Sequence, residues 1–455
     1  MNSVDLDRAH VWHPFTPTDA WFDPHFKPVM IASARGSVLL DEEGNAYLDG
    51  NSSIWTNMHG HNHPVINQAI KDQLDRVAHT SYLGLGHGPG SLLGEKLTAL
   101  VGPDKYRVFY SDDGATAIEA AIKITLQHFD QINQPQRRLF VSLGNGYHGD
   151  TVGAMSVGHS SFHTGHFNSL MFPSVEVMQP GCYRCPCNRA TPERADARTY
   201  RQCEWQCLAA LEKVFQERGP EIAALVLEPR VQGAAGMVMH PAGYLAKAAQ
   251  IAKDAGAMLI LDEVMTGFGR TGEMFAADHE GVKADLIALA KGLTGGYLPL
   301  GATLIREEIF QSYRGPIERT FYHGHSYCGN QLGCAAALAN LELFDTEHTL
   351  DKIRDRAAQL KSLSQIFWQH PHVGDIRQDG FILGIELVED FATRKPFPFE
   401  RRIAYHVSER AKQYGLLARG AGNVLILMPP YSTTKEQLEK MVEALYRGLC
   451  EELPA

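Results

Sequence analysis

The sequence predicts an α/β protein with two parts: a large domain on a mostly parallel sheet and a smaller α/β domain built from both termini. From about residue 209, short apolar runs alternate with amphipathic helical segments, as in a parallel sheet covered on both faces. Three of these runs end in polar residues, at Glu228, Asp262 and Lys291. After about residue 344 the alternation stops, which indicates a second, mixed domain.

The length of 455 residues exceeds what one hydrophobic core usually supports. We therefore expect residues 1–50 to form the N-terminal part of the small domain. Residues 51–335 are expected to form the large domain, and residues 336–455 the C-terminal part of the small domain.

The first half of the chain begins with an N-terminal arm and two short strands, at 37–41 and 46–50, separated by the turn sequence EEGN. Apolar residues at helical spacing predict helices over 65–79 and 91–102. Residues 107–111 are typical of a strand, and a small polar turn connects them to a long helix. A further strand is predicted over 139–143.

The second half alternates more regularly. Strands are predicted over 222–229, 257–263 and 284–291, the last ending at Lys291, with helices over 207–218 and 244–256. A helix over 330–344 precedes the change of pattern. The expected C-terminal elements are strands within 372–388 and 423–430 and helices over 352–367, 403–415 and 435–453.

Composition excludes several classes of function. A net charge of −10 argues against nucleic acid or an acidic membrane as the main partner. No apolar run approaches the roughly 20 residues of a membrane span, and the N-terminus lacks the apolar segment of a secretory signal. We therefore expect a soluble, cytoplasmic protein.

Two groups of residues raise the question of a metal. Cys182, Cys185, Cys187, Cys203 and Cys207 cluster in the sequence, but their spacing matches a zinc site only loosely, and reduced cysteines are the favoured interpretation. Histidines alternate at His59, His61 and His63, where a turn with hydrogen-bonded imidazoles is favoured over a metal site. We assign no metal ligands, and leave the cysteine cluster open.

Three kinds of enzyme compete for the segment 259–291. A P-loop NTPase would need a Gly-Lys-Ser or Gly-Lys-Thr sequence, which is absent. A dinucleotide enzyme is suggested by the glycines of GFGRTG, Gly267, Gly269 and Gly272. That fingerprint requires a strand and a helix directly beside the glycines, and neither flanks them here.

A pyridoxal-phosphate enzyme fits better. That cofactor needs a lysine to hold its aldehyde and an acid to keep its pyridine nitrogen protonated. Lys291 and Asp262 follow successive strands, separated by a connection long enough for a parallel crossover. The turn from Gly114 to Thr116 opens a helix and offers an anion site for the phosphate, although an ordinary helix cap is an equal alternative there. Tyr147 offers an aromatic face for the ring, or is a packing residue.

LILDEVMTGFGRTG and ALAKGLTGGYLPLGA resemble the signature of the class III aminotransferases, pyridoxal-phosphate enzymes of fold type I, and the likeness covers essentially the whole chain. The resemblance implies a mostly parallel sheet of seven strands in the large domain. Within the class, VWHPFT, SSIWTNMHGHNHP, YSDDGATAIEAAIK, NGYHGDT, FYHGHSYCGNQLGCAAA and LARGAGNVLILMPP resemble the 8-amino-7-oxononanoate aminotransferases of biotin synthesis. Those enzymes use S-adenosylmethionine or, in some members, lysine as amino donor.

The resemblance implies a role for each matching residue. Lys291 would hold the cofactor covalently, Asp262 would pair with its pyridine nitrogen, and Tyr147 would stack on its ring. The phosphate would be bound by Gly114 and Ala115, joined by Ser326 from a partner subunit of a homodimer. The substrate pocket would be lined by Phe15, Trp55, Tyr147, Gly324 and Arg419, with Arg419 meeting the substrate carboxylate.

Two positions depart from the family pattern. Ala115 stands where many members carry serine, and Phe15 stands where members that use S-adenosylmethionine often carry tyrosine. The second departure leaves the amino donor open. The rival function is transfer from an ω-amino acid or polyamine to pyruvate or 2-oxoglutarate, and a non-catalytic cofactor-binding protein is a weaker alternative. The role of Glu263, beside Asp262, is also left open, with support of the strand end as one possibility.

Overall fold

The core of the molecule is a seven-stranded sheet. The computed structural model describes residues 2–102, 105–159 and 165–454. Every neighbouring pair runs parallel except those that involve β12, which is antiparallel to both its neighbours. In spatial order the strands are β4 (Tyr106–Ser111), β12 (Gly301–Arg306), β11 (Leu286–Leu289), β10 (Met258–Asp262), β7 (Ile222–Leu227), β5 (Leu139–Leu143) and β6 (Val175–Val177). The predicted α/β fold with a mostly parallel seven-stranded sheet is confirmed.

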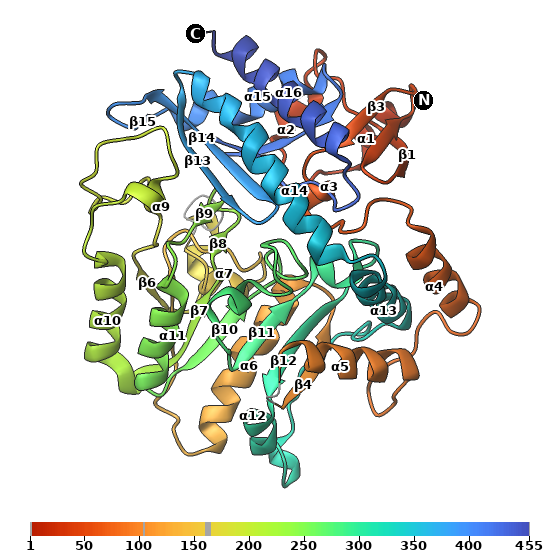
Figure 1. Ribbon diagram of the computed structural model, residues 1–455. Helices are drawn as coiled ribbons and strands as arrows, with labels where there is room; N and C mark the ends of the chain where they lie inside the picture. Colours follow the sequence, from red (N-terminus) through yellow and green to blue (C-terminus); the bar gives the residue numbers. More distant parts are fainter. Residues whose placement is uncertain (1, 103–104, 160–164, 455) are drawn as a thin grey trace.

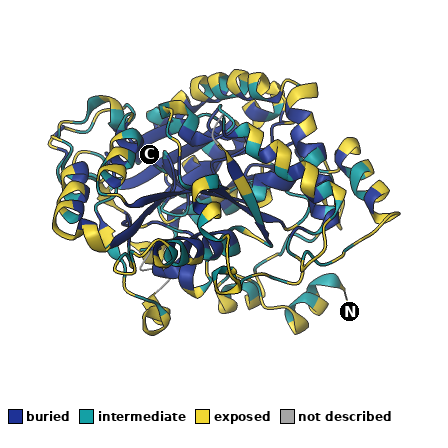
Figure 2. Ribbon diagram, turned by 90° about the horizontal axis from the view of Figure 1, so that it is seen from below, coloured by how far each residue is buried: buried dark blue, intermediate teal, exposed yellow. Residues whose placement is uncertain are grey.

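Side chains of the central strand β10 alternate between two hydrophobic cores. Met258 and Ile260 belong to a core that includes helix α6 (Gly114–Gln131). Leu259 and Leu261 belong to the opposite core, with helix α11 (Tyr244–Asp254). This period of two is what an extended strand covered on both faces requires. Figure 1 shows α6 and α11 beside the sheet, and in Figure 2 the strands are buried while the outer helix faces are exposed.

Sequence patterns located most of these strands closely. Residues 139–143 form β5 as predicted, whereas β6 and β12 were not predicted. β6 has three residues, too few to show a period. The predicted strand ending at Lys291 is too long: β11 ends at Leu289, because Lys291 has a φ of 43°, which a strand cannot accommodate.

Both ends of the chain build the upper part of the molecule in Figure 1. Strand β16 pairs in parallel with β3, so C-terminal residues complete a sheet begun near the N-terminus. That sheet contains β1 (Ile31–Arg35), β2 (Val38–Asp41), β3 (Ala46–Asp49) and β16 (Leu416–Leu417). A second sheet contains β13 (Val373–Asp379), β14 (Ile382–Asp390), β15 (Lys395–Pro396), β17 (Arg419–Ala421) and β18 (Val424–Leu427). The boundaries at residues 50 and 335 stay a prediction, and helix α13 (Gln331–Thr346) continues through the second of them.

The remaining helices lie around these sheets. Those of the C-terminal part are α14 (Thr349–Leu363), α15 (Ile403–Lys412) and α16 (Lys435–Glu452). Those of the first half are α1 (Ser3–His10), α2 (Thr18–Phe22), α3 (Ser52–Trp55), α4 (Pro64–Leu74), α5 (Gly88–Leu100) and α7 (Val152–Ser156). Further along the chain are α9 (Ala197–Tyr200), α10 (Gln206–Arg218) and α12 (Glu307–Ser312). In the part of the chain described, we find no helix with the length and apolar character that a membrane span demands.

Candidate active site

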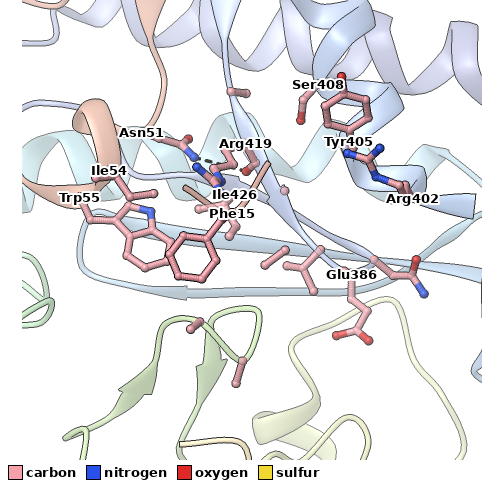
Figure 3. A pocket seen from close by; sticks show the side chains of 18 of the residues that line it. Phe15, Asn51, Ile54, Trp55, Glu386, Arg402, Tyr405, Ser408, Arg419 and Ile426 are labelled. Atoms are coloured by element: carbon pink, nitrogen blue, oxygen red, sulfur yellow. Dashed lines mark hydrogen bonds between the residues drawn. The ribbon is translucent and has the colours of Figure 1, made fainter. Parts of the chain in front are cut away.

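A cleft of about 1560 Å³ opens where the carboxyl ends of the central strands face the C-terminal sheets. Ligands of open α/β sheets bind at such strand ends. Five of the residues predicted for the site line this cleft: Phe15, Trp55, Tyr147, Lys291 and Arg419. Figure 3 shows Trp55 and Phe15 close together, with Arg419 above them.

Lys291 lies just beyond β11, at the first residue of the 3₁₀ turn η4 (Lys291–Thr294). Its Nζ is 5.3 Å from the centroid of the Trp55 ring. Burial lowers the pKa of Lys291 below its usual value, and this outweighs the opposite effect of Asp262 and Glu228; Arg270 lowers it further. A lysine with a lowered pKa is more often neutral, and so can attack an aldehyde or take up a proton.

Asp262, the last residue of β10, is buried behind the cleft. Its Oδ2 lies 2.8 Å from Nδ1 of His148, and its Oδ1 accepts the Val264 N–H at 3.0 Å. Burial lowers the pKa of His148, but the hydrogen bond and charge of Asp262 raise it more, so the net shift is upward. The imidazolium form of His148 is thus favoured more than in an ordinary histidine, and it would place a positive charge beside the Asp262 carboxylate.

His148 was not assigned a role from the sequence. It follows Tyr147 in the turn after β5, where the sequence contains a histidine beside an aromatic residue, but this pattern does not reveal which buried acid it will meet.

Glu228, just after β7, is a second buried acid near Lys291. Its carboxylate accepts the N–H groups of Tyr147 at 3.2 Å and Gly233 at 2.8 Å. Burial raises the pKa of Glu228 to about 7.

Glu263 has different surroundings from its neighbour Asp262. Its carboxylate accepts the hydroxyl of Thr266 at 2.5 Å and the N–H groups of Ala276 and Ala277 at 3.1 and 2.9 Å. Burial raises its pKa to about 7. Glu263 therefore ties the start of the connection between β10 and β11 to a later part of the same connection.

The glycines of GFGRTG lie within this connection. Gly269 has a φ of 90°, and a Cβ atom on it would be 2.8 Å from Cδ1 of Ile353. Arg270 is fully buried and donates to the carbonyl oxygens of Pro429 and Asn57, both at 2.9 Å. The segment thus packs against other parts of the chain, and it lacks the strand–turn–helix arrangement of a dinucleotide site.

The predicted phosphate site is the start of α6. Asp113 caps this helix by accepting the N–H of Thr116 at 2.8 Å. A Cβ atom at Gly114 would lie 2.7 Å from Cγ1 of Val264, so the close approach of the two segments requires glycine. Gly114 and Ala115 are outside the set of described residues that line the cleft.

Ser326 and Gly324 are on an exposed loop and likewise do not line the cleft of this chain, as far as the described residues show. The Ser326 carbonyl oxygen lies 2.8 Å from Nε2 of His79. The structure therefore brings Lys291 and Asp262 near the predicted pocket residues Phe15, Trp55, Tyr147 and Arg419, and leaves the loop of Gly324 and Ser326 apart from them.

Arg419 begins β17 and is exposed. Its carbonyl oxygen accepts a hydrogen bond from Nδ2 of Asn51 at 3.3 Å, and in the described part of the chain no acidic side chain pairs with its guanidinium.

Another charged group in the cleft was not predicted from the sequence. Arg377 donates to Asp375 at 3.1 Å and to Glu386 at 2.7 Å, and all three are buried. Their strand positions gave no sign that they would face a cleft.

The histidines and cysteines considered as metal ligands have other surroundings. Nε2 of His61 lies 2.9 Å from Asp49, and Nε2 of His63 lies 3.1 Å from Glu347. Burial raises the pKa of Cys182 to about 12, so its thiol stays protonated at neutral pH. Among residues 2–102, 105–159 and 165–454, no group of three or more His, Cys, Asp or Glu side chains is placed to hold a metal ion.

Comparisons with known proteins agree with this geometry. The family model described as "Aminotransferase class-III" matches residues 22–449. The adenosylmethionine-8-amino-7-oxononanoate aminotransferase of Nitratidesulfovibrio vulgaris is 46% identical over 97% of this chain and 80% of that protein.

Solved structures show the same relationship. The crystal structure of the adenosylmethionine-8-amino-7-oxononanoate aminotransferase from Methanocaldococcus jannaschii superimposes with a TM-score of 0.91 and 38% identity, over 98% of each chain. A PLP-bound amine transaminase from an uncultivated Pseudomonas species has a TM-score of 0.89 and 33% identity, over 97% of this chain and 98% of that one. Pyridoxal phosphate is the cofactor of this family. The chain belongs to the class III aminotransferases.

Proposed function

We propose that this aminotransferase converts 8-amino-7-oxononanoate to 7,8-diaminononanoate in biotin synthesis, with S-adenosylmethionine or lysine as amino donor. The observation that carries the proposal is the pairing within one cleft of a lysine of lowered pKa with an arginine that has no acid partner among the described residues. The relatives named above for this reaction match nearly the whole chain.

The residues present fit pyridoxal phosphate. A buried, charge-stabilised carboxylate at Asp262 suits a protonated ring nitrogen, and the amine of Lys291 suits the aldehyde. The N–H groups at the start of α6 suit a phosphate, because helix N-termini attract anions. Tyr147 is positioned for the ring by two contacts: its N–H donates to Glu228, and its hydroxyl donates to Asp150 at 2.8 Å.

When bound, the cofactor supplies a conjugated ring that withdraws electrons from the carbon bearing the transferred amino group. Nζ of Lys291, in its neutral form, would take the proton from that carbon of the donor in the first half-reaction, and would deliver a proton to the corresponding carbon of the acceptor in the second. The Asp262 carboxylate lies buried beside this chemistry, with Nδ1 of His148 held 2.8 Å from its Oδ2. Trp55, whose ring centroid lies 5.3 Å from Nζ of Lys291, and Tyr147, which lines the same cleft, would limit the access of water to this amine.

Arg419 would bind the carboxylate of the oxononanoate, because a guanidinium forms two parallel hydrogen bonds with a carboxylate. Phe15, 59% exposed at the mouth of the cleft, offers an apolar face without a hydroxyl group. An apolar face does not distinguish S-adenosylmethionine from lysine, so the amino donor must be identified by experiment. Gly324 is included in the pocket as a residue of the loop that also carries Ser326.

The proposal includes a homodimer, in which Ser326 completes the phosphate site of the partner subunit. Large apolar side chains are exposed on both sides of Ser326 and on a nearby loop: Leu83 (81% exposed), Tyr322 (75%) and Tyr327 (60%). Exposed large apolar side chains around one loop suit a protein interface.

We also place the protein in the cytoplasm. Its eight cysteines are all free thiols, as is usual in a reducing compartment.

A donor panel tests the function. Purified holoenzyme is incubated with 8-amino-7-oxononanoate and one donor at a time: S-adenosylmethionine, lysine, β-alanine, 4-aminobutyrate or a polyamine. Mass spectrometry then detects 7,8-diaminononanoate. The proposal expects product with S-adenosylmethionine or lysine. Efficient transfer to pyruvate or 2-oxoglutarate, with no diaminononanoate from any donor, would overturn it.

The dimer has a separate test. Neither Lys291→Ala nor Ser326→Trp protein should be active alone, since each lacks one part of every site. A mixed dimer contains one site with both defects and one with neither. Unfolding and refolding the two variants together should therefore restore turnover, whereas a site contained in one chain would show no recovery.

A further inference from the structure

Asp49 is a buried carboxylate that no role assigned so far explains. It is the last residue of β3 and is 2% exposed. Its Oδ1 accepts the N–H of Asn51 at 3.1 Å, and both its oxygens accept the N–H of Ser53, at 3.0 and 2.8 Å. His61 approaches Oδ2 with Nε2 at 2.9 Å. Four contacts on one aspartate are more than a simple turn requires.

His61 is fixed in a donating orientation. Its Nδ1 lies 3.4 Å from Nδ2 of Asn57, an amide nitrogen that can only donate. When Nδ1 accepts from that amide, the ring proton is on Nε2, next to Oδ2 of Asp49. His61 belongs to the alternating histidines of the sequence, and this contact gives it a structural task.

The segment held by Asp49 has an unfavourable backbone. Ser52, Ser53 and Trp55 have φ values of 50°, 64° and 64°, in the left-handed region that side chains other than glycine avoid. Residues in such conformations persist only where their surroundings enforce them. The hydroxyl of Ser52 adds a hydrogen bond of 2.7 Å to the carbonyl of Met428.

This strained segment connects two parts of the cleft. At one end, Trp55 carries the ring that faces Nζ of Lys291. At the other end, Asn51 donates to the carbonyl of Arg419, the proposed carboxylate-binding residue. Figure 3 shows Asn51, Ile54 and Trp55 descending along one side of the pocket, with the contact to Arg419 drawn.

We infer that Asp49, oriented by His61, is a positioning residue that sets the distance between the Lys291 end of the cleft and the carboxylate-binding end. The inference rests on the proposed function for the identity of the substrate. Asp49 itself lines the cleft, but its carboxylate oxygens are engaged by Asn51, Ser53 and His61, so we assign it to positioning and not to contact with substrate. It acts by forcing residues 51–55 into a conformation that they would otherwise leave, and so by fixing Trp55 and the backbone of Arg419 relative to each other.

Asp41 provides a matched control. It is also a buried aspartate in the same sheet, and it also accepts N–H groups of a following turn, from Glu43 at 3.0 Å and Asn45 at 2.8 Å. Asp41 is not among the described residues that line the cleft, and neither are Glu43 and Asn45, whose N–H groups it accepts. Loss of a buried turn-holding aspartate is thus common to Asp41→Ala and Asp49→Ala, while only the second should disturb the pocket.

Kinetics of the holoenzyme form the first test. Asp49→Ala should raise the KM for 8-amino-7-oxononanoate roughly 10- to 100-fold, because misplacement of a binding group by about 1 Å has effects of that size. The kcat should fall much less. Asp49→Asn keeps the shape of the side chain and one acceptor oxygen, so its KM should lie between those of Asp49→Ala and wild type. This variant takes the place of Asp49→Ala in the test if the alanine variant does not fold. Asp41→Ala should keep the wild-type KM.

Hydrogen exchange gives a readout that does not depend on activity. Amides of residues 51–55 should exchange at least about tenfold faster in Asp49→Ala or Asp49→Asn than in wild type, because both their acceptor and their restraint are weakened. The same amides should be unchanged in Asp41→Ala. Wild-type exchange at 51–55 together with a wild-type KM in both Asp49 variants would overturn the inference.

A double-mutant cycle with Arg419→Ala separates positioning from general destabilisation. If Asp49 acts by placing the carboxylate-binding residue, Asp49→Ala should raise KM by less than about twofold when the Arg419 side chain is already removed. Fully additive effects would overturn the inference. Should wild-type enzyme fail to use 8-amino-7-oxononanoate, the proposed function falls, yet the exchange comparison and the KM for whichever carboxylate it does use still test Asp49.

Discussion

The two ends of the cleft are built in different ways. At the inner end, Asp262 ends a strand of the central sheet and Glu228 and Lys291 lie just beyond two others, and the buried acids have hydrogen-bond partners within the same chain. At the outer end, Phe15 and Arg419 are exposed, and the loop of Ser326 lies apart. The inner end is therefore specified by the sheet, while the outer end depends on loops and, in our proposal, on a second subunit.

This difference suggests a division of labour. A rigid, buried inner end suits chemistry common to all substrates, because fixed charges need no rearrangement as the reaction proceeds. An open outer end suits the choice of substrate. Variants of the inner end should therefore change kcat, and variants of the outer end should mainly change KM.

The largest effect is expected for Lys291→Ala. Loss of the amine removes both the covalent attachment of the cofactor and the proton carrier, so kcat should fall by roughly a thousandfold or more. Borohydride treatment followed by peptide mass spectrometry should label Lys291 in wild type and no lysine in the variant. Lys253→Ala, on the exposed face of α11, is the control and should behave as wild type. A reducible cofactor adduct in Lys291→Ala protein would contradict the assignment.

A smaller loss of turnover is expected for Asp262→Asn. The amide has the shape of the carboxylate but no charge, so kcat should drop about 10²- to 10³-fold, as when a preorganised charge is removed from a buried site. The fold should persist, because the amide can keep a contact with His148. Near-normal kcat in protein that binds the cofactor would break the distinction between the two ends, since it would show that the buried charge is dispensable.

At the outer end, Arg419→Ala should raise the KM for the oxononanoate roughly 10- to 100-fold, as expected when one partner of a charge-assisted contact is lost. Its kcat should change far less, and cofactor absorbance should be that of wild type. Arg419→Lys retains the charge without the bidentate geometry and should give an intermediate KM. If kcat fell and KM did not change, Arg419 would belong with the chemical end.

The inner end was largely predictable from sequence, for a physical reason. An apolar run that ends in a polar residue marks a strand end, and parallel strands bring their ends to one edge, so Asp262 and Lys291 could be placed together without coordinates. His148 could not, because its partner is 114 positions away and the contact depends on the turn after β5. The Asp375–Arg377–Glu386 group was missed because charged residues on a strand give no sign of the face they occupy.

At the outer end the sequence predicted residues without their arrangement. Trp55 and Arg419 were expected in the pocket only through the resemblance to known aminotransferases. In our inference, their mutual placement depends on the left-handed backbone of Ser52, Ser53 and Trp55, which local propensity disfavours and the contacts to Asp49 enforce. Contacts of this kind join residues that are hundreds of positions apart, such as Asn51 and Arg419.

Glu263 gives the finest test of how the inner end of the cleft works, because it adjoins Asp262 and should have no part in turnover. Its pKa is raised by burial from 4.5 to about 7, so the folded protein holds a proton there that the unfolded chain releases above pH 4.5. The carboxyl therefore stabilises the fold fully below pH 4.5, and this contribution is lost as the pH rises through about 7.

Glutamine, like the protonated acid, carries no charge at any pH. Relative to wild type, Glu263→Gln should have a similar free energy of unfolding at pH 5 and a larger one at pH 8, by about 1–3 kcal/mol. Urea denaturation at the two pH values measures this, with kcat as a control that should not change; a fall in kcat comparable to that of Asp262→Asn would show that the two neighbouring acids act together after all.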